Sequence, residues 1–297
     1  MKNFIKRTLT GILFVAVLVG CILYTPTTFG LLFALITGLA VWEFGTLINQ
    51  SGQAVINHPI CGLAGVYLFL AVMGFSENLF GGEVFVPYLI MLIYLLVAEL
   101  YLRHPNPMNN WAYTMMSQLY VALPFALLSV LYFYPVQMMQ GEALTVAVTP
   151  MLPLSVFIFL WASDSGAYLV GSLIGKHRLF ERISPKKSWE GSIGGGVLAL
   201  VAAWALWYFF PIMSLWQWIG MALVVVVFGT WGDLVESLLK RQLGIKDSGH
   251  ILPGHGGILD RFDSSMLAVP AVVIYLYTLY IYFHLYHILH KPMATVL

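Results

Sequence analysis

The chain has 297 residues, of which 60% are hydrophobic and only 9% are charged, and its formal net charge is +1. Soluble domains carry roughly 25% charged residues, so this composition excludes a soluble enzyme, a disordered chain and a coiled coil. The small net charge gives no indication of a nucleic-acid partner. The composition predicts an all-α, polytopic integral membrane protein.

Nine apolar stretches are candidates for membrane-spanning helices, each of which needs about 20 mostly apolar residues. We expect these spans near residues 8–24, 29–48, 60–76, 84–102, 112–134, 151–172, 190–210, 215–239 and 264–284. With nine spans, 13 basic residues fall on the side of the N-terminus and only Lys291 falls on the other. Because basic loops stay in the cytoplasm, the N-terminus is predicted to be cytoplasmic.

The first apolar stretch also allows a second interpretation. Residues 2–21 have a basic start and an apolar core that ends at Cys21, as a lipoprotein signal does. The rest of the chain is itself membrane-embedded and needs no secretion signal, so a retained first helix is the better interpretation. Glu43 and Glu99 each lie in an apolar span, where we expect hydrogen bonds between helices rather than a polar cavity.

Of the 27 charged residues, 17 lie in two segments, residues 164–190 and 233–263, called here the first and second charged segments. In the first, Asp164 is either a polar site group or an interface residue paired with Lys or Ser. Ser184 and Pro185 predict an N-cap and a first helical residue. Lys186 and Lys187 would then oppose the helix dipole unless an anion binds, or would anchor the loop in the cytoplasm.

In the second charged segment, Asp233, Glu236 and Lys240 have the spacing of one helix face, and Asp260 and Asp263 begin the ninth span. Two carboxylate pairs facing each other across a loop could hold hard divalent cations, which favour oxygen ligands. Interfacial salt bridges are the alternative. Further groups could meet a phosphate through positive charge or backbone amides, namely Arg241, Lys246, His255, Gly256, Gly257 and Arg261.

The order of these residues resembles a known signature. The pattern Ser237-x-x-Lys240-Arg241, Lys246-Asp247-x-Gly249 and Leu252-Pro253-x-His255-Gly256-Gly257-x-x-Asp260-Arg261-x-Asp263 looks like that of the phosphatidate cytidylyltransferases, or CDP-diacylglycerol synthases. Residues 184–191 are similar to a second block of that family, with Ser188 where Thr is common. The resemblance covers about residues 161–264, so residues 1–150 of a single domain are expected to be mainly scaffold and residues 151–290 a catalytic half.

The resemblance implies a reaction in phospholipid synthesis, in which CTP and phosphatidate give CDP-diacylglycerol and pyrophosphate. It also implies Mg²⁺, with a second cation allowed, and a membrane-embedded homodimer. The active site would face the cytoplasm from a bacterial inner membrane. The family's metal-binding aspartates match Asp233 and Asp260.

On that basis the residues receive hypothetical roles. The catalytic set is Asp233, Asp260, Lys240 and Arg261. The further metal ligands or orienting groups are Asp263, Glu236 and Asp247. The groups that would hold triphosphate and lipid phosphate are Lys186, Lys187, Lys240, Arg241, Lys246 and Arg261, and His255, Gly256 and Gly257 would shape the backbone around phosphate. A CTP-dependent polyprenol or dolichol kinase is the alternative enzyme, and an anion transporter is the alternative from another class.

Overall fold

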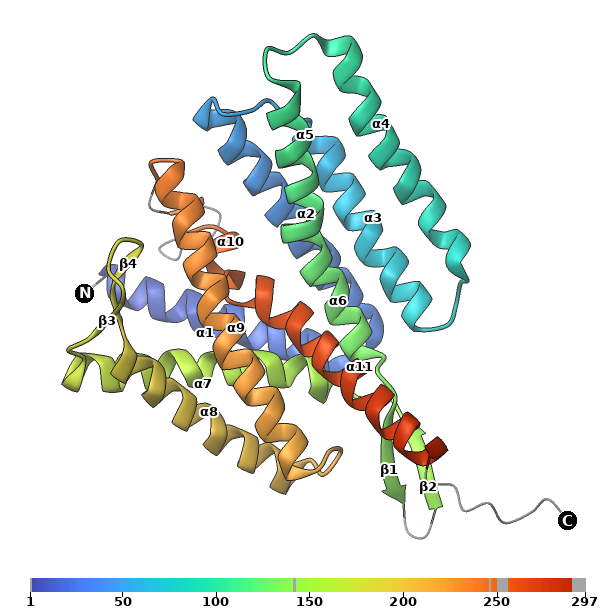
Figure 1. Ribbon diagram of the computed structural model, residues 1–297, viewed down its shortest axis with the longest axis vertical. Helices are drawn as coiled ribbons and strands as arrows, with labels where there is room; N and C mark the ends of the chain where they lie inside the picture. Colours follow the sequence, from blue (N-terminus) through green and yellow to red (C-terminus); the bar gives the residue numbers. More distant parts are fainter. Residues whose placement is uncertain (1, 141–142, 246, 250–255, 290–297) are drawn as a thin grey trace, which may run out of the picture.

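The computed structural model describes residues 2–140, 143–245, 247–249 and 256–289 (Figure 1). Its α-helices are α1 (Lys2–Tyr24), α2 (Pro26–Ser51), α3 (His58–Ser76), α4 (Val86–Leu102), α5 (Pro107–Met116), α6 (Leu123–Tyr132), α7 (Met151–Ile174), α8 (Trp189–Phe209), α9 (Leu215–Gln242), α10 (Leu259–Phe262) and α11 (Ser265–Leu289). A 3₁₀ helix, η1 (Gly82–Phe85), precedes α4, and a π-helix, η2 (Ser117–Ala122), joins α5 to α6.

All nine predicted spans are helical, which confirms the all-α membrane class. Among the described residues, eight helices are long and apolar enough to cross a membrane, and the first span forms a shorter apolar helix at Thr8–Tyr24. The fifth span begins earlier than expected, at Pro107, and continues through η2 into α6. Pro124 lies in the first turn of α6, directly after η2, and its ring cannot donate a hydrogen bond to the preceding turn.

Two antiparallel hairpins lie between the helices. The strands β1 (Val136–Gln140) and β2 (Ala143–Ala147) pair between α6 and α7, and β3 (Arg178–Phe180) pairs with β4 (Ser184–Ser188) between α7 and α8. Figure 1 shows the β1–β2 hairpin beside the end of α11 at the lower right and the β3–β4 hairpin near the N-terminus on the left.

The prediction that Ser184 and Pro185 begin a helix is wrong. Both residues belong to β4, and α8 starts at Trp189 with Ser188 as its N-cap. The Ser188 hydroxyl accepts a hydrogen bond of 3.1 Å from the Gly191 amide, as an N-cap does. The four preceding residues are therefore free to pair with β3. Lys186 and Lys187 lie on this strand, so the predicted conflict with a helix dipole does not arise.

Helices α7 and α8 pack closely through small residues. A Cβ atom on Gly195 would lie 2.5 Å from the Ser163 carbonyl oxygen, and one on Gly166 would lie 2.6 Å from the Gly194 carbonyl oxygen. Such distances leave no room for any side chain, because the two backbones themselves are in contact. This contact fixes the hairpin that precedes α8 against the end of α7.

The aromatic ring of Phe262 lies at the centre of the core, where it is 2% exposed. It packs against Phe14 of α1, Phe33 of α2, Phe125 of α6 and Phe157 of α7, at ring-centroid distances of 5.2–6.5 Å. Each of these aromatic pairs contributes about 0.5–1.5 kcal/mol through ring packing. The short helix α10 is therefore held among four long helices.

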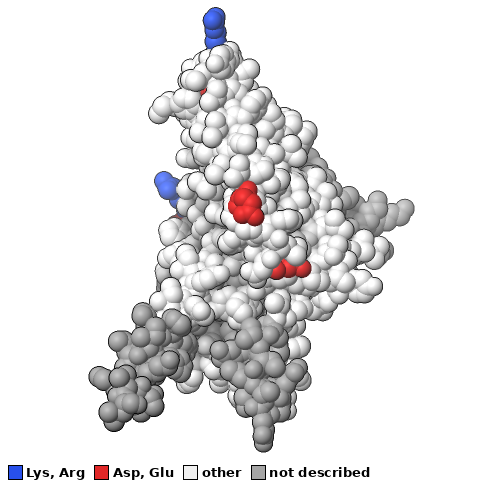
Figure 2. All heavy atoms as spheres, turned by 90° about the vertical axis from the view of Figure 1, so that its right-hand side faces the viewer, with Lys and Arg blue, Asp and Glu red and all other residues white. Residues whose placement is uncertain are grey.

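The outer surface is apolar. Figure 2 shows one face on which uncharged residues cover nearly all of the area that described residues form, with a few isolated charged groups. Large hydrophobic side chains point outward on several helices, including Leu31 of α2, Ile90 of α4 and Ile274 of α11, each at least 60% exposed. Exposed apolar area on this scale is what a lipid-facing surface requires.

Candidate active site

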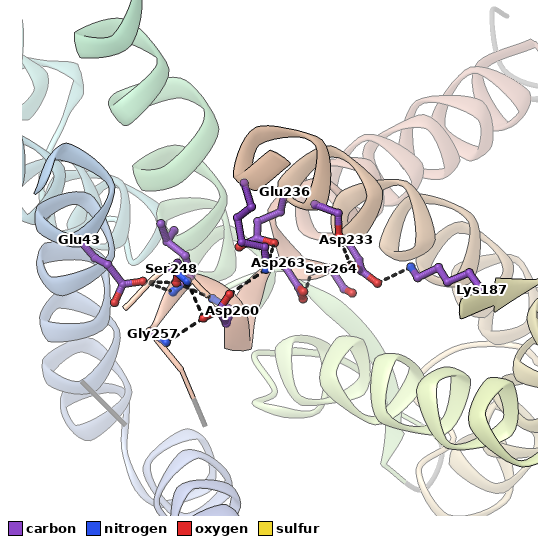
Figure 3. Close-up of polar contacts among 12 residues, drawn as sticks. Glu43, Lys187, Asp233, Glu236, Ser248, Gly257, Asp260, Asp263 and Ser264 are labelled. Atoms are coloured by element: carbon purple, nitrogen blue, oxygen red, sulfur yellow. Dashed lines mark hydrogen bonds and ion pairs between the residues drawn. The ribbon is translucent and has the colours of Figure 1, made fainter. Parts of the chain in front are cut away.

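Lys240 connects two carboxylates from different helices (Figure 3). Its ammonium nitrogen lies 2.6 Å from Glu236 Oε2 on the same helix, α9, and 2.8 Å from Asp260 Oδ1 on α10. The Glu236 side chain is 4% exposed and the Lys240 side chain 16%. The predicted shared helix face is confirmed, and this face points toward α10.

Three donors hold the Asp260 carboxylate. Lys240 binds Oδ1, while the backbone amides of Ser248 and Gly257 each donate to Oδ2 at 2.9 Å. Gly256 has a φ of +84°, a conformation that residues with a Cβ rarely adopt. A Cβ atom added to Gly256 would also lie 3.2 Å from Asp260 Cγ. The Gly256-Gly257 pair therefore lets the backbone fold around a carboxylate, whereas its predicted contact with phosphate stays a prediction.

Asp233 joins the two charged segments. One of its oxygens forms an ion pair with Lys187 of β4, and the other accepts a hydrogen bond of 3.2 Å from Ser237. The Asp233 and Lys187 side chains are 29% and 26% exposed, so the pair lies at the edge of the site (Figure 3). The hairpin that carries Lys187 is itself held by Glu190, whose carboxylate lies 2.5 Å from His177 Nδ1.

Four carboxylates line one pocket of about 420 Å³, which we call the acidic pocket. Its charged residues are Asp164, Asp233, Asp260, Arg261 and Asp263. Helix α1 completes the wall with Thr10 and Gly11, which the sequence marks only as part of an apolar span. Asp164, which the sequence left open between two roles, is thus placed with the other carboxylates.

A second pocket of about 360 Å³ adjoins the first between α7, α8 and α9, and we call it the lysine pocket. Lys186 and Lys187 line its polar end, and apolar side chains such as Leu160 and Val225 line the rest. The two pockets share Asp164 and Ser264. A charged group in the lysine pocket would therefore lie beside the carboxylates of the acidic pocket.

Some predicted site residues lie elsewhere. Arg241 and Asp247 are exposed, and neither lines the acidic pocket or the lysine pocket as the described residues form them. Lys246 and His255 lie outside the described residues. The phosphate-binding roles of Arg241, Lys246 and His255 and the metal-binding role of Asp247 stay predictions.

Sequence reasoning underestimated Glu43. We expected it to bond to another membrane-spanning helix, as Glu99 does through Asn110 Nδ2 at 2.6 Å. Instead, the Glu43 carboxylate bonds to the second charged segment, at Ser248 and at the backbone of Ile258 and Leu259. The only signal in the sequence was a lone carboxylate within an apolar span, which is costly to insert and so needs partners.

The donors of the acidic pocket fit a hard divalent cation. Within the described residues, no group of three His, Cys, Asp or Glu side chains has the geometry of a complete metal site. Mg²⁺, however, usually takes only one or two carboxylates and completes its coordination with water and substrate phosphates. The acidic pocket offers four carboxylates and no nitrogen or sulfur ligand, apart from the Arg261 side chain, which does not bind metals.

Comparison with known proteins places the chain among enzymes of one kind. The model of the "Cytidylyltransferase family" matches residues 5–279. The phosphatidate cytidylyltransferase of Haemophilus influenzae is 34% identical over 284 residues, covering 89% of this chain and 96% of that protein. The enzyme of the same name from Staphylococcus haemolyticus is 33% identical and covers 91% of this chain and 98% of its own. That of Staphylococcus aureus is 51% identical over a shorter stretch, 40% of this chain and 46% of the relative.

Proposed function

The chain belongs to the cytidylyltransferase family, and from this we propose that it is a phosphatidate cytidylyltransferase. It transfers the cytidylyl group of CTP to phosphatidate and releases pyrophosphate, which yields CDP-diacylglycerol for phospholipid synthesis. The observation that carries the proposal beyond resemblance is the pair of adjoining pockets, one acidic and one with lysines above apolar walls. A nucleotide with a bound cation suits the first, and a lipid phosphate with its acyl chains suits the second.

The chemistry requires positioning and charge neutralisation more than proton transfer. An oxygen of the ionised lipid phosphate attacks the α-phosphorus of CTP, and the bond from that phosphorus to the β-phosphate bridging oxygen breaks. Because the nucleophile is already ionised, no strong general base is needed. The two anions must be brought into line, and positive charge must stabilise the phosphoryl group and the leaving pyrophosphate.

The side chains divide this work as follows. Lys187 and Lys186 hold the lipid phosphate at the polar end of the lysine pocket. Asp233 and Asp260 are the principal ligands of Mg²⁺, with Asp263 and Asp164 beside them in the acidic pocket. When bound, the cation supplies Lewis-acid stabilisation of phosphate charge. Arg261, exposed at the same pocket, binds the triphosphate.

Lys240 has a positioning role in this scheme. Its ammonium group lies between Glu236 and Asp260, so its charge is already matched by two carboxylates. A phosphate contact by Lys240, as the sequence predicted, requires that one of these ion pairs open. In the arrangement described here, Lys240 instead orients Asp260 toward the acidic pocket.

The location in the cell follows from charge. Thirteen of the 14 basic residues fall on one side if the spans alternate, which favours a site that faces the cytoplasm, where CTP is found. A bacterial inner membrane and a homodimer belong to the same proposal, on the basis of the family resemblance.

The decisive experiment is an assay of the purified protein in mixed micelles with phosphatidate, Mg²⁺ and CTP labelled on the α-phosphate. We expect label in the lipid extract, in CDP-diacylglycerol. A polyprenol or dolichol kinase would instead label lipid only from γ-labelled CTP with an isoprenoid alcohol. An anion transporter would move labelled phosphate into proteoliposomes without CTP, and either result in place of CDP-diacylglycerol would overturn the proposal.

A further inference from the structure

Glu43 belongs to α2, in the part of the chain expected to be scaffold, yet its carboxylate lies against the segment that carries Asp260 (Figure 3). We propose that Glu43 is a positioning residue for the cytidylyl transfer, because it fixes the backbone that presents Asp260 to the acidic pocket. This inference rests on the proposed function and adds to it a requirement from the first half of the chain.

Three donors bind the Glu43 carboxylate. The Ser248 hydroxyl donates to Oε1 at 2.5 Å, the Leu259 amide donates to the same oxygen at 3.1 Å, and the Ile258 amide donates to Oε2 at 2.9 Å. Glu43 is 5% exposed, so water contributes little to its solvation. A buried carboxylate with three donors is held firmly, since each charge-assisted hydrogen bond is stronger than a neutral one.

These contacts continue to Asp260 through Ser248. The hydroxyl of Ser248 donates to Glu43 and accepts a hydrogen bond of 3.3 Å from the Asp260 amide. The backbone amide of Ser248 in turn donates to Asp260 Oδ2 at 2.9 Å. Glu43 therefore fixes Ser248, and Ser248 fixes both the backbone and the side chain of Asp260.

Two glycines show how closely the segment approaches Glu43. A Cβ atom on Gly249 would lie 2.7 Å from Glu43 Oε2, and one on Gly257 would meet the Glu43 carboxylate, both closer than atoms of real side chains come. Both residues belong to the motif that the sequence singled out. The close approach of the Glu43 carboxylate explains why these positions require glycine, as contact with a bound phosphate also would.

Glu99 provides a matched control. It is also a buried carboxylate within a membrane-spanning helix, 8% exposed, but its partners are Asn110 and His104, which line neither the acidic pocket nor the lysine pocket. Glu43→Gln and Glu99→Gln make the same chemical change. Each replaces an acceptor oxygen with an NH₂ group, which at residue 43 would face another donor.

The first test measures kcat and KM in the full-length enzyme. For Glu43→Gln we expect kcat to fall about 10- to 100-fold, the loss that one or two charge-assisted hydrogen bonds predict, while KM for phosphatidate changes less than about threefold. Glu99→Gln should keep kcat within about threefold. Ser248→Ala should reproduce the loss, and the double variant with Glu43→Gln should be no worse than the poorer single variant, because both act through one link.

Several results would overturn the proposal. A wild-type kcat in Glu43→Gln would do so, as would a loss shared equally by Glu99→Gln, or independent losses that multiply in the double variant. If Glu43→Gln fails to fold, Ser248→Ala carries the test alone, because it breaks the link to Asp260 and leaves the two amides bound to Glu43. In that case a wild-type kcat in Ser248→Ala overturns the proposal.

A second measurement separates this proposal from the proposed function. Hydrogen–deuterium exchange of the amides of residues 257–260 should accelerate about 10-fold or more in Glu43→Gln and stay unchanged in Glu99→Gln. This readout needs no substrate. If the wild-type protein made no CDP-diacylglycerol, the proposed function would fail while the anchoring by Glu43 could still be observed. Unchanged exchange in Glu43→Gln would refute the anchoring whatever the activity.

Discussion

Lys187 of β4 and Asp233 of α9 form an ion pair that joins the two charged segments across the site. Each residue also has a second, proposed partner. Asp233 is proposed to bind a cation, and Lys187 is proposed to bind a lipid phosphate. Arrival of the cation and of phosphatidate would thus exchange one ion pair for two new contacts.

Lys187→Met should lower kcat/KM for phosphatidate about 10- to 100-fold, because it removes a charge-assisted contact with the lipid phosphate and leaves Asp233 without its ion-pair partner. Arg182→Met is the control, since Arg182 is exposed in the same hairpin and lines neither the acidic pocket nor the lysine pocket. Steady-state kinetics with phosphatidate varied at saturating CTP provide the measurement. Equal effects of the two variants would contradict the assignment.

Asp233→Asn and Asp260→Asn should each reduce product formation by about 100-fold or more, because each aspartate would hold the proposed cation that neutralises phosphate charge. Asp260→Asn carries a further cost, because its new NH₂ group would face Lys240 or the two backbone amides that donate to the carboxylate. Glu181→Gln is the control, since Glu181 is exposed and lines neither the acidic pocket nor the lysine pocket, and it should stay within about threefold of wild type. Full activity in Asp260→Asn would exclude the metal role.

Chelation of divalent cations should abolish CDP-diacylglycerol formation, and added Mg²⁺ should restore it. The reason is that four carboxylates converge on the acidic pocket and a triphosphate adds further negative charge there. The assay is run after removal of metal with a chelator and gel filtration, followed by titration with Mg²⁺. Activity that persists without any added divalent cation would show that the basic residues alone are sufficient.

Gly195→Ala should destabilise the protein, by about 1–3 kcal/mol, because the new Cβ would lie 2.5 Å from the Ser163 carbonyl oxygen and force α7 and α8 apart. Gly196→Ala is the matched control, since a Cβ there meets nothing within 4 Å. It should be neutral or stabilising by up to about 1 kcal/mol through helix propensity. Thermal unfolding in detergent compares the two, and equal stabilities would refute the close contact.

The two sides of the membrane can be assigned by cysteine labelling, after Cys21→Ser and Cys61→Ala remove the native thiols. Phe180 at the end of β3 and Leu79 before η1 are exposed and fall on opposite predicted sides. A membrane-impermeant maleimide should label Leu79→Cys in intact cells and Phe180→Cys only in permeabilised cells. The reverse pattern would invert the orientation.

The membrane-embedded fold was largely predictable, because a span of about 20 apolar residues is a local property of the sequence. The ends of the spans were less so. Ser184, which precedes Pro185, and Ser188 are both residues of a type that caps helices. Only the pairing of β3 with β4 decides which of them begins α8. The helical face of Asp233, Glu236 and Lys240 was predictable for the same local reason, since spacing along one helix fixes it.

The partners of these side chains were not predictable. Glu43 and Ser248 are 205 residues apart, and nothing local to either position indicates the contact. Likewise, the sequence around Lys240 suggests a phosphate-binding lysine. It does not show that ion pairs with Glu236 and Asp260 already match the charge of this lysine. Composition gives the kinds of groups at a site, whereas their pairing depends on how the helices pack.

The anchoring of the Asp260 segment by α2 has a consequence for how such proteins diversify. A chimera that takes residues 1–150 from one relative and the remainder from another would exchange Glu43 separately from Ser248 and the glycines that accommodate it. Such a hybrid would work only if both parents kept the same acceptor and the same small residues. Recombination within this chain is therefore constrained by a contact between residues that line neither pocket, and a functional hybrid must preserve it.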